Sequence, residues 1–201
     1  MQSTPGYESN NAEKTWWSSL STHWKSVFFE TGAIRGNPES ISDAELTACY
    51  QSPVLRIVGP DGSNSNYSGG LLDLEGLRGL YHLEYLFVMH CGLETLAGIE
   101  DLVYLKALYL QNNRLTEFQA IRKMTQLQEL HISNNQITSL APLKYCKSLH
   151  KVYCENNFIT SLDGLEPDHE KYLRVFKCRP NEHLPQREII RVQNTYGILC
   201  N

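Results

Sequence analysis

The chain has 201 residues, 41% hydrophobic and 20% charged, which are ordinary proportions for a soluble globular domain or a capped repeat array. Its formal net charge of −4 argues against a general nucleic-acid-binding protein, which would carry a basic stripe. The sequence has no apolar run near the roughly 18 residues that a membrane-spanning helix needs, so we expect neither a nucleic-acid partner nor a membrane partner.

The N-terminal residues have few large apolar side chains and lack the apolar segment of a signal peptide. Residues 1–14 are therefore expected to form a flexible tail, and the protein is expected to be cytoplasmic. No two of the six cysteines have the C-x-x-C spacing of a zinc or redox site. We expect free thiols, no metal and no cofactor.

Residues 15–50 are expected to form a helical N-terminal cap. Large apolar side chains from Trp16 to Phe28 fall close to one face of a helix that starts at Thr15. Ser42-Asp-Ala-Glu45 resembles a capping box before a second, short helix that ends near Tyr50. The aromatic face favours a cap over the first unit of a repeat array, and a helix lying on a membrane surface is the alternative.

Residues 51–182 are expected to form the repeat array. Val54–Val58 has the composition of a first strand, and residues 59–70 (GPDGSNSNYSGG) follow it as a turn-rich loop insertion. The glycines of this insertion superficially suggest a phosphate-binding loop, but the G-K-[ST] ending of such a loop is missing. A flexible loop is the favoured interpretation.

The repeat has a period of 22 residues and recurs in register from Leu83, Leu105, Leu127 and Leu149. Alternating apolar residues early in each unit predict a short strand, and apolar residues at every third position later predict a helical or 3-10 return segment. One position after the strand holds an asparagine whose amide can pair with backbone groups exposed by the turn, so that stacked units form a ladder. The ladder residues are Asn113, Asn135 and Asn157, with Cys91 in the equivalent place of an earlier unit.

This pattern resembles the 22-residue class of leucine-rich repeats, found in internalin-like bacterial proteins and in regulators of phosphatase-1. The stretch from Asn135 to Leu149, NQITSLAPLKYCKSL, carries the resemblance most clearly. The resemblance implies an α/β fold, a leucine-rich-repeat solenoid of about six rungs that stack because no single rung can bury its apolar face. Its short, curved parallel sheet would be backed by helical or 3-10 return segments.

The last part of the chain is expected to close the array. The strand pattern returns at Leu173, Phe176 and Cys178, and Asn181 falls on the ladder position, after which the periodicity fades. Residues 183–201 are expected to form a C-terminal cap, because an uncovered sheet edge promotes aggregation. Its apolar contacts are expected from Ile189, Ile190, Val192, Ile198 and Leu199.

Side chains that alternate with the buried strand residues point outward onto the concave face of the sheet. Along the array, the middle outward position reads Arg56, Phe87, Tyr109, His131, Tyr153 and Lys177, which predicts a near-continuous aromatic stripe. Nothing inside the fold requires aromatic residues there, and aromatic residues anchor interfaces, although they also favour strands in general. The predicted partner-binding residues are Tyr85, Phe87, Met89, Tyr109, Gln111, Glu129, His131, Lys151, Tyr153, Glu155, Lys177 and Arg179.

Charge on this face is uneven. Positive side chains gather towards its C-terminal end, where an acidic segment of a partner would fit; they are Lys151, Arg174, Lys177 and Arg179.

No catalytic motif is visible: the sequence has no H-E-x-x-H, no G-x-S-x-G and no phosphate loop. The one conceivable acid–base or metal cluster combines His131, His150, Glu129 and Glu155, but polar residues are common at exposed strand positions of repeat proteins. We therefore expect no catalytic residues and a monomeric protein-protein interaction module that binds a protein or peptide. The alternatives are a regulatory or immunity-like inhibitor that occludes a partner enzyme and, third, an enzyme.

Overall fold

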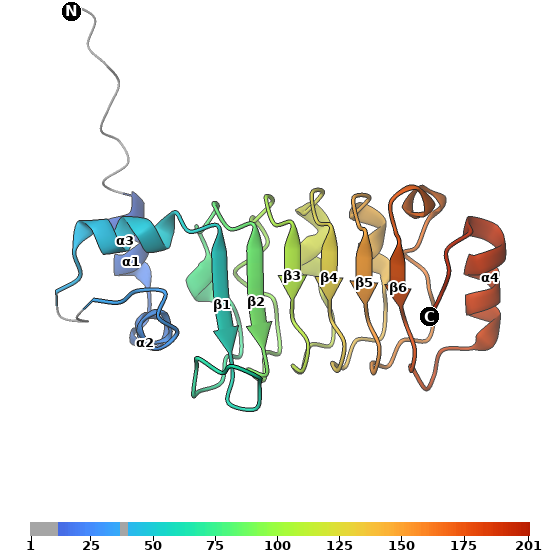
Figure 1. Ribbon diagram of the computed structural model, residues 1–201, viewed down its shortest axis with the longest axis horizontal. Coiled ribbons are helices and arrows are strands. Elements are labelled where there is room, and N and C mark those ends of the chain that lie inside the picture. The colour runs from blue at the N-terminus through green and yellow to red at the C-terminus, as the bar shows by residue number, and fades with distance from the viewer. Residues whose placement is uncertain (1–11, 37–39) are drawn as a thin grey trace, which may run out of the picture.

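The computed structural model describes residues 12–36 and 40–201. Its centre is a single sheet of six parallel strands whose spatial order follows the chain (Figure 1). Adjacent strands pair in register, so that Leu86, Leu108 and Leu130 lie side by side. The strands are β1 (Val54–Val58), β2 (Tyr85–Met89), β3 (Ala107–Tyr109), β4 (Glu129–His131), β5 (Lys151–Tyr153) and β6 (Val175–Lys177). The predicted α/β solenoid with a parallel sheet is confirmed.

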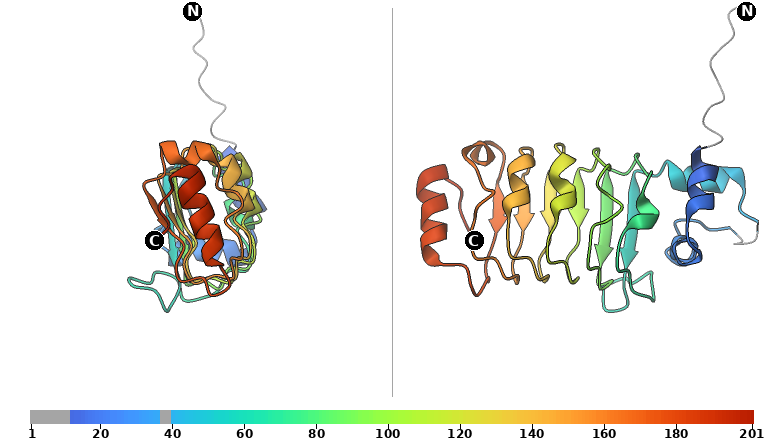
Figure 2. Two further views of the ribbon diagram at one scale, coloured as in Figure 1. Left: turned by 90° about the vertical axis from the view of Figure 1, so that its right-hand side faces the viewer. Right: turned by 180° about the vertical axis from the view of Figure 1, so that it is seen from behind.

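The return segments form a second layer behind the sheet, seen in front in the right-hand view of Figure 2. Four of the five contain a short 3-10 helix, as the three-residue spacing of apolar side chains predicts, and the segment between β2 and β3, whose residues are all described, contains none. The bounds of the 3-10 helices are Glu75–Leu77, Gln119–Lys123, Ala141–Tyr145 and Pro167–Lys171. No element of the described residues covers the other face of the sheet, and we call it the sheet face.

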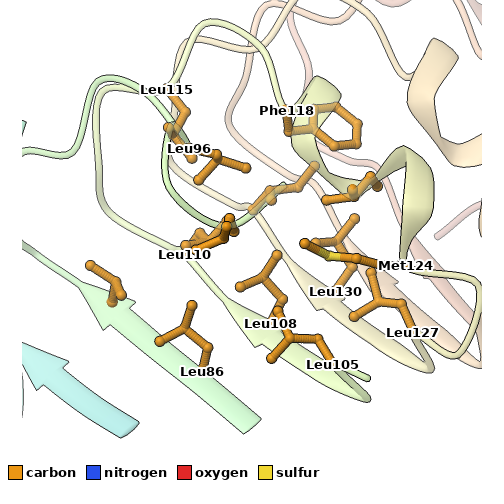
Figure 3. Close-up of a cluster of buried hydrophobic side chains, with 14 of the residues drawn as sticks. Leu86, Leu96, Leu105, Leu108, Leu110, Leu115, Phe118, Met124, Leu127 and Leu130 are labelled. Carbon is orange, nitrogen blue, oxygen red and sulfur yellow. The ribbon is translucent and has the colours of Figure 1, made fainter. Parts of the chain in front are cut away.

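The core lies between the two layers. Leu86, Leu108 and Leu130 point inward from the strands and meet Phe118 and Met124 from the return side (Figure 3). All five side chains are fully buried. Burial of each such side chain contributes about 1.5–3 kcal/mol, so the apolar pattern of the repeat is what holds neighbouring rungs together.

The N-terminal end of the array is covered by three helices, α1 (Ala12–Ser19), α2 (Thr22–Glu30) and α3 (Asp43–Tyr50). The expectation of one continuous helix from Thr15 is wrong in two respects. The first helix begins at Ala12, inside the expected tail, whose residues 1–11 lie outside the described residues. A break then separates α1 from α2, because the hydroxyl of Ser21 caps a new helix by accepting a hydrogen bond from Trp24 N at 3.2 Å.

Helices α1 and α2 bury aromatic side chains against the first rung. Trp16, Trp24 and Phe28 are buried, and Trp16 Nε1 donates a hydrogen bond to Gly76 O at 3.2 Å. Helix α3 begins with the expected capping box, in which Ser42 and Glu45 bond each other's backbone N–H. Among the described residues, no helix combines the length and the apolar character needed to cross a membrane.

The insertion at residues 59–70 is tied to the sheet by hydrogen bonds. Asn66 Oδ1 accepts from Val58 N at 2.8 Å, and Asn66 Nδ2 donates to Arg56 O at 2.8 Å and to Thr31 O at 3.1 Å. The Arg56 guanidinium donates to Asn64 O and Ser63 O, at 2.9 and 3.2 Å. The Arg56 side chain therefore bonds this loop, although Arg56 occupies an outward position of the sheet.

The C-terminal end of the array is covered by α4 (Gln186–Tyr196) and the residues after it. Asn201 bonds the backbone of β6 and the residues that follow it: Asn201 N donates to Phe176 O at 3.0 Å, and Asn201 O accepts from Cys178 N at 2.9 Å. Ile189, Val192 and Ile198 are buried as expected. The expectation for two other residues is wrong: Ile190 is 46% exposed and Leu199 is 70% exposed, because these side chains face away from the array.

Candidate functional site: the sheet face

The central feature of the sheet face is a column of side chains that runs across the strands. Strand register places the rings of Phe87, Tyr109, His131 and Tyr153 on neighbouring rungs, followed by Lys177 on β6. We call the four rings the ring stack. They occupy the same outward position of consecutive strands, because side chains alternate along each strand.

The rings stack face to face. Ring centroids are separated by 4.4 Å between Phe87 and Tyr109, 4.2 Å between Tyr109 and His131, and 4.3 Å between His131 and Tyr153. The corresponding interplanar angles are 13°, 22° and 15°. The Nζ of Lys177 lies 5.6 Å from the centroid of Tyr153 and closes the column with a cation–π contact.

Stacking changes how much of each ring is accessible. We expected an exposed stripe, but Phe87, Tyr109, His131 and Tyr153 are all half-buried. Each inner ring has both faces covered by its neighbours, so it cannot rotate away without breaking these contacts. The column is thus a continuous surface of ring edges rather than a row of independent side chains.

Three polar side chains form a cluster beside the ring stack. The hydroxyl of Tyr109 donates to Glu129 Oε2 at 2.9 Å, and Lys151 Nζ donates to Glu129 Oε1 at 2.6 Å. The hydrogen bond from Lys151 is the main cause that lowers the pKa of Glu129. Burial, and to a smaller extent the hydrogen bond to Glu129, raises the pKa of Tyr109 to about 12. At neutral pH the cluster therefore holds a carboxylate, an ammonium and a neutral phenol.

His131 has an unusual environment in the middle of the stack. Its side chain is 20% exposed, and its Nε2 is buried without a hydrogen-bond partner among the described residues. The closest carboxylate oxygen, Glu129 Oε2, is 3.7 Å away. Burial lowers the pKa of His131 more than the nearby carboxylate raises it, so the ring is neutral at neutral pH.

The flanking positions of the sheet face are mixed. Tyr85 is exposed, whereas Ala107 at the equivalent position of β3 is 4% exposed and adds little to the surface. Met89 and Gln111 are half-buried, and Gln111 Oε1 has no hydrogen-bond partner among the described residues. Glu155 accepts a hydrogen bond from the Ser133 hydroxyl at 2.6 Å.

The positive charge at the C-terminal end is smaller than expected. Lys151 is paired with Glu129, and Arg174 donates to the carbonyl oxygens of Glu170 and Lys171 at 3.2 and 2.7 Å. Lys177 and Arg179 are exposed, and neither makes an ion pair with a described residue. Sequence reasoning could not separate the two kinds of cation, because pairing depends on side-chain conformation.

The asparagines at the ladder position join consecutive rungs. Asn135 Nδ2 donates to Leu110 O and Ile132 O at 3.0 and 3.1 Å, and its Oδ1 accepts from Leu115 N at 3.0 Å. Asn113 and Asn157 bond the equivalent backbone groups of their own and the preceding rung. Asn181 repeats the arrangement on the last rung.

A second column precedes this ladder, and sequence reasoning missed it. Asn112, Asn134 and Asn156 have positive φ angles of 60°, 57° and 55°, and His90 has a φ of 56° at the same position. Their side chains also bond between rungs: Asn156 Nδ2 donates to Asn134 Oδ1 at 2.8 Å, and Asn112 Nδ2 lies 2.9 Å from His90 Nε2. The repeated Asn-Asn dipeptide was the available signal, because asparagine tolerates the left-handed conformation better than most residues.

The conceivable acid–base cluster is not assembled. His150 lies apart from His131: its Nδ1 is 2.7 Å from Ser148 O, and its ring packs on Tyr172 with centroids 5.9 Å apart. Within residues 12–36 and 40–201, no group of three or more histidine, cysteine or acidic side chains is placed to hold a metal ion. The six cysteines, all described, are free and buried.

Comparison with known proteins identifies the repeat. The family model described as Leucine Rich repeats (2 copies) matches residues 105–145 and 125–167. No curated protein sequence gives a significant match.

Solved structures show the same fold. An internalin (inlF) from Listeria monocytogenes is 25% identical with a TM-score of 0.53, and the alignment covers 61% of this chain and 34% of the internalin. A leucine-rich-repeat protein from Leptospira interrogans is 22% identical with a TM-score of 0.63, covering 80% of this chain and 40% of the other. The chain therefore spans well under half the length of these two proteins.

A third structure is the leucine-rich-repeat ectodomain of a plant membrane receptor kinase from Arabidopsis thaliana, in complex with Casparian strip integrity factor 2. It is 22% identical with a TM-score of 0.50, covering 69% of this chain and 16% of the ectodomain.

Proposed function

The chain is a leucine-rich-repeat protein, and on that premise we propose that it is a non-catalytic module whose sheet face binds a protein or peptide. The observation that carries this proposal is the ring stack. Leucine-rich-repeat folds serve many functions, so the proposal depends on the residues of this face rather than on the fold. The plant ectodomain in complex with a protein factor is an example of the fold engaged with a partner.

The ring stack has the properties of an interface anchor. Aromatic side chains offer large contact areas, and binding costs entropy mainly when it immobilises mobile side chains. The rings of Tyr109 and His131 are already held on both faces by their neighbours. A partner would therefore meet a preorganised surface.

The proposal includes a monomer acting in the cytoplasm. Helices α1–α3 and α4 cover the two ends of the sheet, so neither β1 nor β6 offers a free edge for pairing with a second chain (Figure 1). The six free, buried thiols suit a reducing compartment.

The test is a double substitution, Tyr109→Ser with Tyr153→Ser, which removes every ring contact of the stack. Lost stacking should lower the free energy of unfolding by about 2–4 kcal/mol, at about 0.5–1.5 kcal/mol per contact. Partner binding should weaken by about 2 kcal/mol or more per anchor. Partners would be captured from native lysate, identified by mass spectrometry and then measured by calorimetry with purified protein.

Two controls make the result specific. Asn135→Ala should also destabilise the fold, yet it leaves the ring stack intact and should keep binding. Gln119→Ala and Lys144→Ala alter exposed return segments and should bind like the wild type. Normal binding by the tyrosine double variant, with loss in the return-segment variants, would move the site to the opposite layer. One stoichiometric partner with enzymatic activity would favour the inhibitor alternative.

A further inference from the structure

We infer that the partner presents an acidic segment to the β6 end of the sheet face and an apolar side chain to its β2 end. This inference rests on the proposed function, and it specifies the chemistry and the orientation of the partner. Four observations carry it: two cations without an ion pair, nearby carboxylates that do not pair with them, the exposed ring edges and the apolar opposite end.

The first observation is a pair of unneutralised cations. Lys177 continues the ring stack on β6, and its ammonium contacts the face of Tyr153 but no carboxylate of the described residues. Arg179 lies two residues further along the chain, and its guanidinium donates to the neutral amide oxygen of Gln186. Both side chains are exposed, so a partner's carboxylates can reach them without displacing an internal ion pair.

The second observation is that the carboxylates nearby do not cancel these cations. The Glu129 carboxylate accepts hydrogen bonds from the Tyr109 hydroxyl and the Lys151 ammonium. The Glu129–Lys151 ion pair has no net charge. Glu155 and Glu182 keep their negative charges, but Glu155 bonds the Ser133 hydroxyl and neither carboxylate lies within ion-pair distance of Lys177 or Arg179. Positive charge at the β6 end is thus local to Lys177 and Arg179, although the chain as a whole carries −4.

The third observation is the orientation of the rings. Because their faces cover one another, the rings turn their edges towards solvent. Ring edges carry the positive part of the aromatic quadrupole, and they favour oxygen atoms over cations. The Tyr153 hydroxyl makes no hydrogen bond with a described residue and adds a free donor beside Lys177. The ring edges favour electron-rich atoms along the whole stack, and the hydroxyl and the ammonium add to this at the β6 end.

The fourth observation is the contrast at the other end. Tyr85, Phe87 and Met89 of β2 are apolar or aromatic, and Tyr85 is 38% exposed. The guanidinium of the adjacent Arg56 is directed to Ser63 O and Asn64 O of the loop. Four rung steps separate β2 from β6, about 19 Å at ~4.8 Å per step, which about six extended residues span. One short segment of a partner can therefore contact both ends.

The test selects partners without assuming their sequence. A phage-displayed library of random twelve-residue peptides is selected on the wild-type protein at low salt, and the enriched peptides are synthesised and titrated by fluorescence anisotropy. We expect enriched peptides to carry Asp or Glu towards one end and apolar residues about six positions away. Raising NaCl should weaken their binding, because surface charges are screened.

Matched charge variants locate the effect. Lys177→Glu with Arg179→Glu should weaken binding of the selected peptides at least about tenfold, since charge reversal turns attraction into repulsion. Arg122→Glu with Lys144→Glu makes the same change in net charge on the return segments, where both cations contact Tyr145. This second pair should leave affinity within about twofold, because screening limits surface charges at that distance.

The outcomes separate the two proposals. Peptides without an acidic excess, or an equal loss in both charge-reversal pairs, would overturn the inference. If such peptides still lose binding in the Tyr109→Ser/Tyr153→Ser variant, the proposed function survives and only the partner chemistry is wrong. If no peptide is enriched, or if enriched peptides bind the tyrosine double variant normally, both the inference and the proposed function fail.

Discussion

At the scale of single residues, the rungs are joined by side-chain amides that replace missing backbone partners. Asn135 accepts a hydrogen bond from the Leu115 N–H group, which the turn would otherwise leave buried and unpaired, and it shares Leu110 O with Asn113 and Ile132 O with Asn157. A buried polar group without a partner costs more than an average hydrogen bond contributes. The ladder residues therefore contribute to stability out of proportion to their size.

Asn135→Ala should lower the free energy of unfolding by about 1–3 kcal/mol, because it leaves the buried Leu115 N–H group without a partner and removes one of the two amide bonds to each of Leu110 O and Ile132 O. Urea unfolding followed by circular dichroism measures the change. The neighbouring Gln136→Ala is the control: its side chain is exposed, and its backbone bond to Leu115 O is retained. Equal, negligible effects of both substitutions would contradict the role of the ladder.

His131 should make stability depend on pH. Burial lowers its pKa in the folded protein below the ordinary 6.5, so the unfolded chain takes up a proton more readily than the folded one. The contribution of the neutral His131 ring to the free energy of unfolding is therefore fully present above pH 6.5, the pKa in the unfolded chain. It is lost as the pH falls from there through the lower pKa of the folded protein.

The measurement compares urea midpoints at pH 7.5 and pH 5 for the wild type and His131→Phe. The phenylalanine ring keeps the stack but cannot be protonated, so the variant should lose less stability at pH 5. Some dependence will remain, because burial also lowers the pKa of His169. An identical loss in both proteins would mean that protonation of His131 is not opposed by the fold.

The alternation of side chains along each strand predicted which residues lie on the sheet face, but it did not predict which of these side chains contact one another. The order Phe87, Tyr109, His131, Tyr153 can be read from the sequence once the strand register is known. Whether the rings stack or splay depends on their χ angles, and so does the choice of Lys151 rather than Lys177 as partner of Glu129. These choices depend on neighbouring rungs, which a single repeat does not reveal.

At the scale of elements, periodicity predicted the strands and return segments but failed at the N-terminal cap. Apolar residues continue across the break between α1 and α2, so the pattern from Trp16 to Phe28 looks like one helix. The signal that ends the first helix is local, the capping hydroxyl of Ser21, and it competes with the apolar pattern. The repeat array was easier to predict because the same pattern recurs in every unit.

Gly76 should be essential for docking of this cap. A Cβ at this position would lie 2.0 Å from Trp24 Cδ2, so Gly76→Ala forces the indole out of its site. Overpacking of this kind costs about 1–3 kcal/mol. All three tryptophans lie between residues 16 and 24, so tryptophan fluorescence reports the cap while circular dichroism reports the whole chain.

In the Gly76→Ala variant, the fluorescence transition should move to lower urea than the circular dichroism transition. Gly70→Ala is the control, since its added Cβ would meet only Cys91 O at 3.3 Å. Superimposed transitions at the wild-type midpoint would show that the cap tolerates the methyl group.

At the scale of the whole molecule, the reactivity of the buried thiols should report which part of the array opens first. Burial raises the pKa of Cys49 and of Cys146 to about 12, so their reactive thiolate forms are rare at neutral pH. Cys200 differs, because a hydrogen bond with Cys178 lowers its pKa. It is also close to the C-terminal surface, at 8% exposed.

Iodoacetamide should therefore label Cys200 first in the folded protein and all six cysteines in denaturant, as followed by peptide mass spectrometry. Raising the pH from 7 to 9 should accelerate labelling of Cys200 less than labelling of an ordinary thiol, because more of it is already deprotonated. Early labelling of Cys49 or Cys146 instead would show that the array opens at its N-terminal cap or its middle before its C-terminal end.

The ring stack also limits how the sheet face can change. Every inner ring shares its two faces with the rings before and after it, so a single replacement leaves neighbours exposed on the sides that they had covered. Substitutions in Phe87, Tyr109, His131 and Tyr153 should therefore not be additive, since contacting residues couple energetically. An engineer who wants a new specificity on this protein should exchange consecutive 22-residue units as a block, with their rings matched to one another.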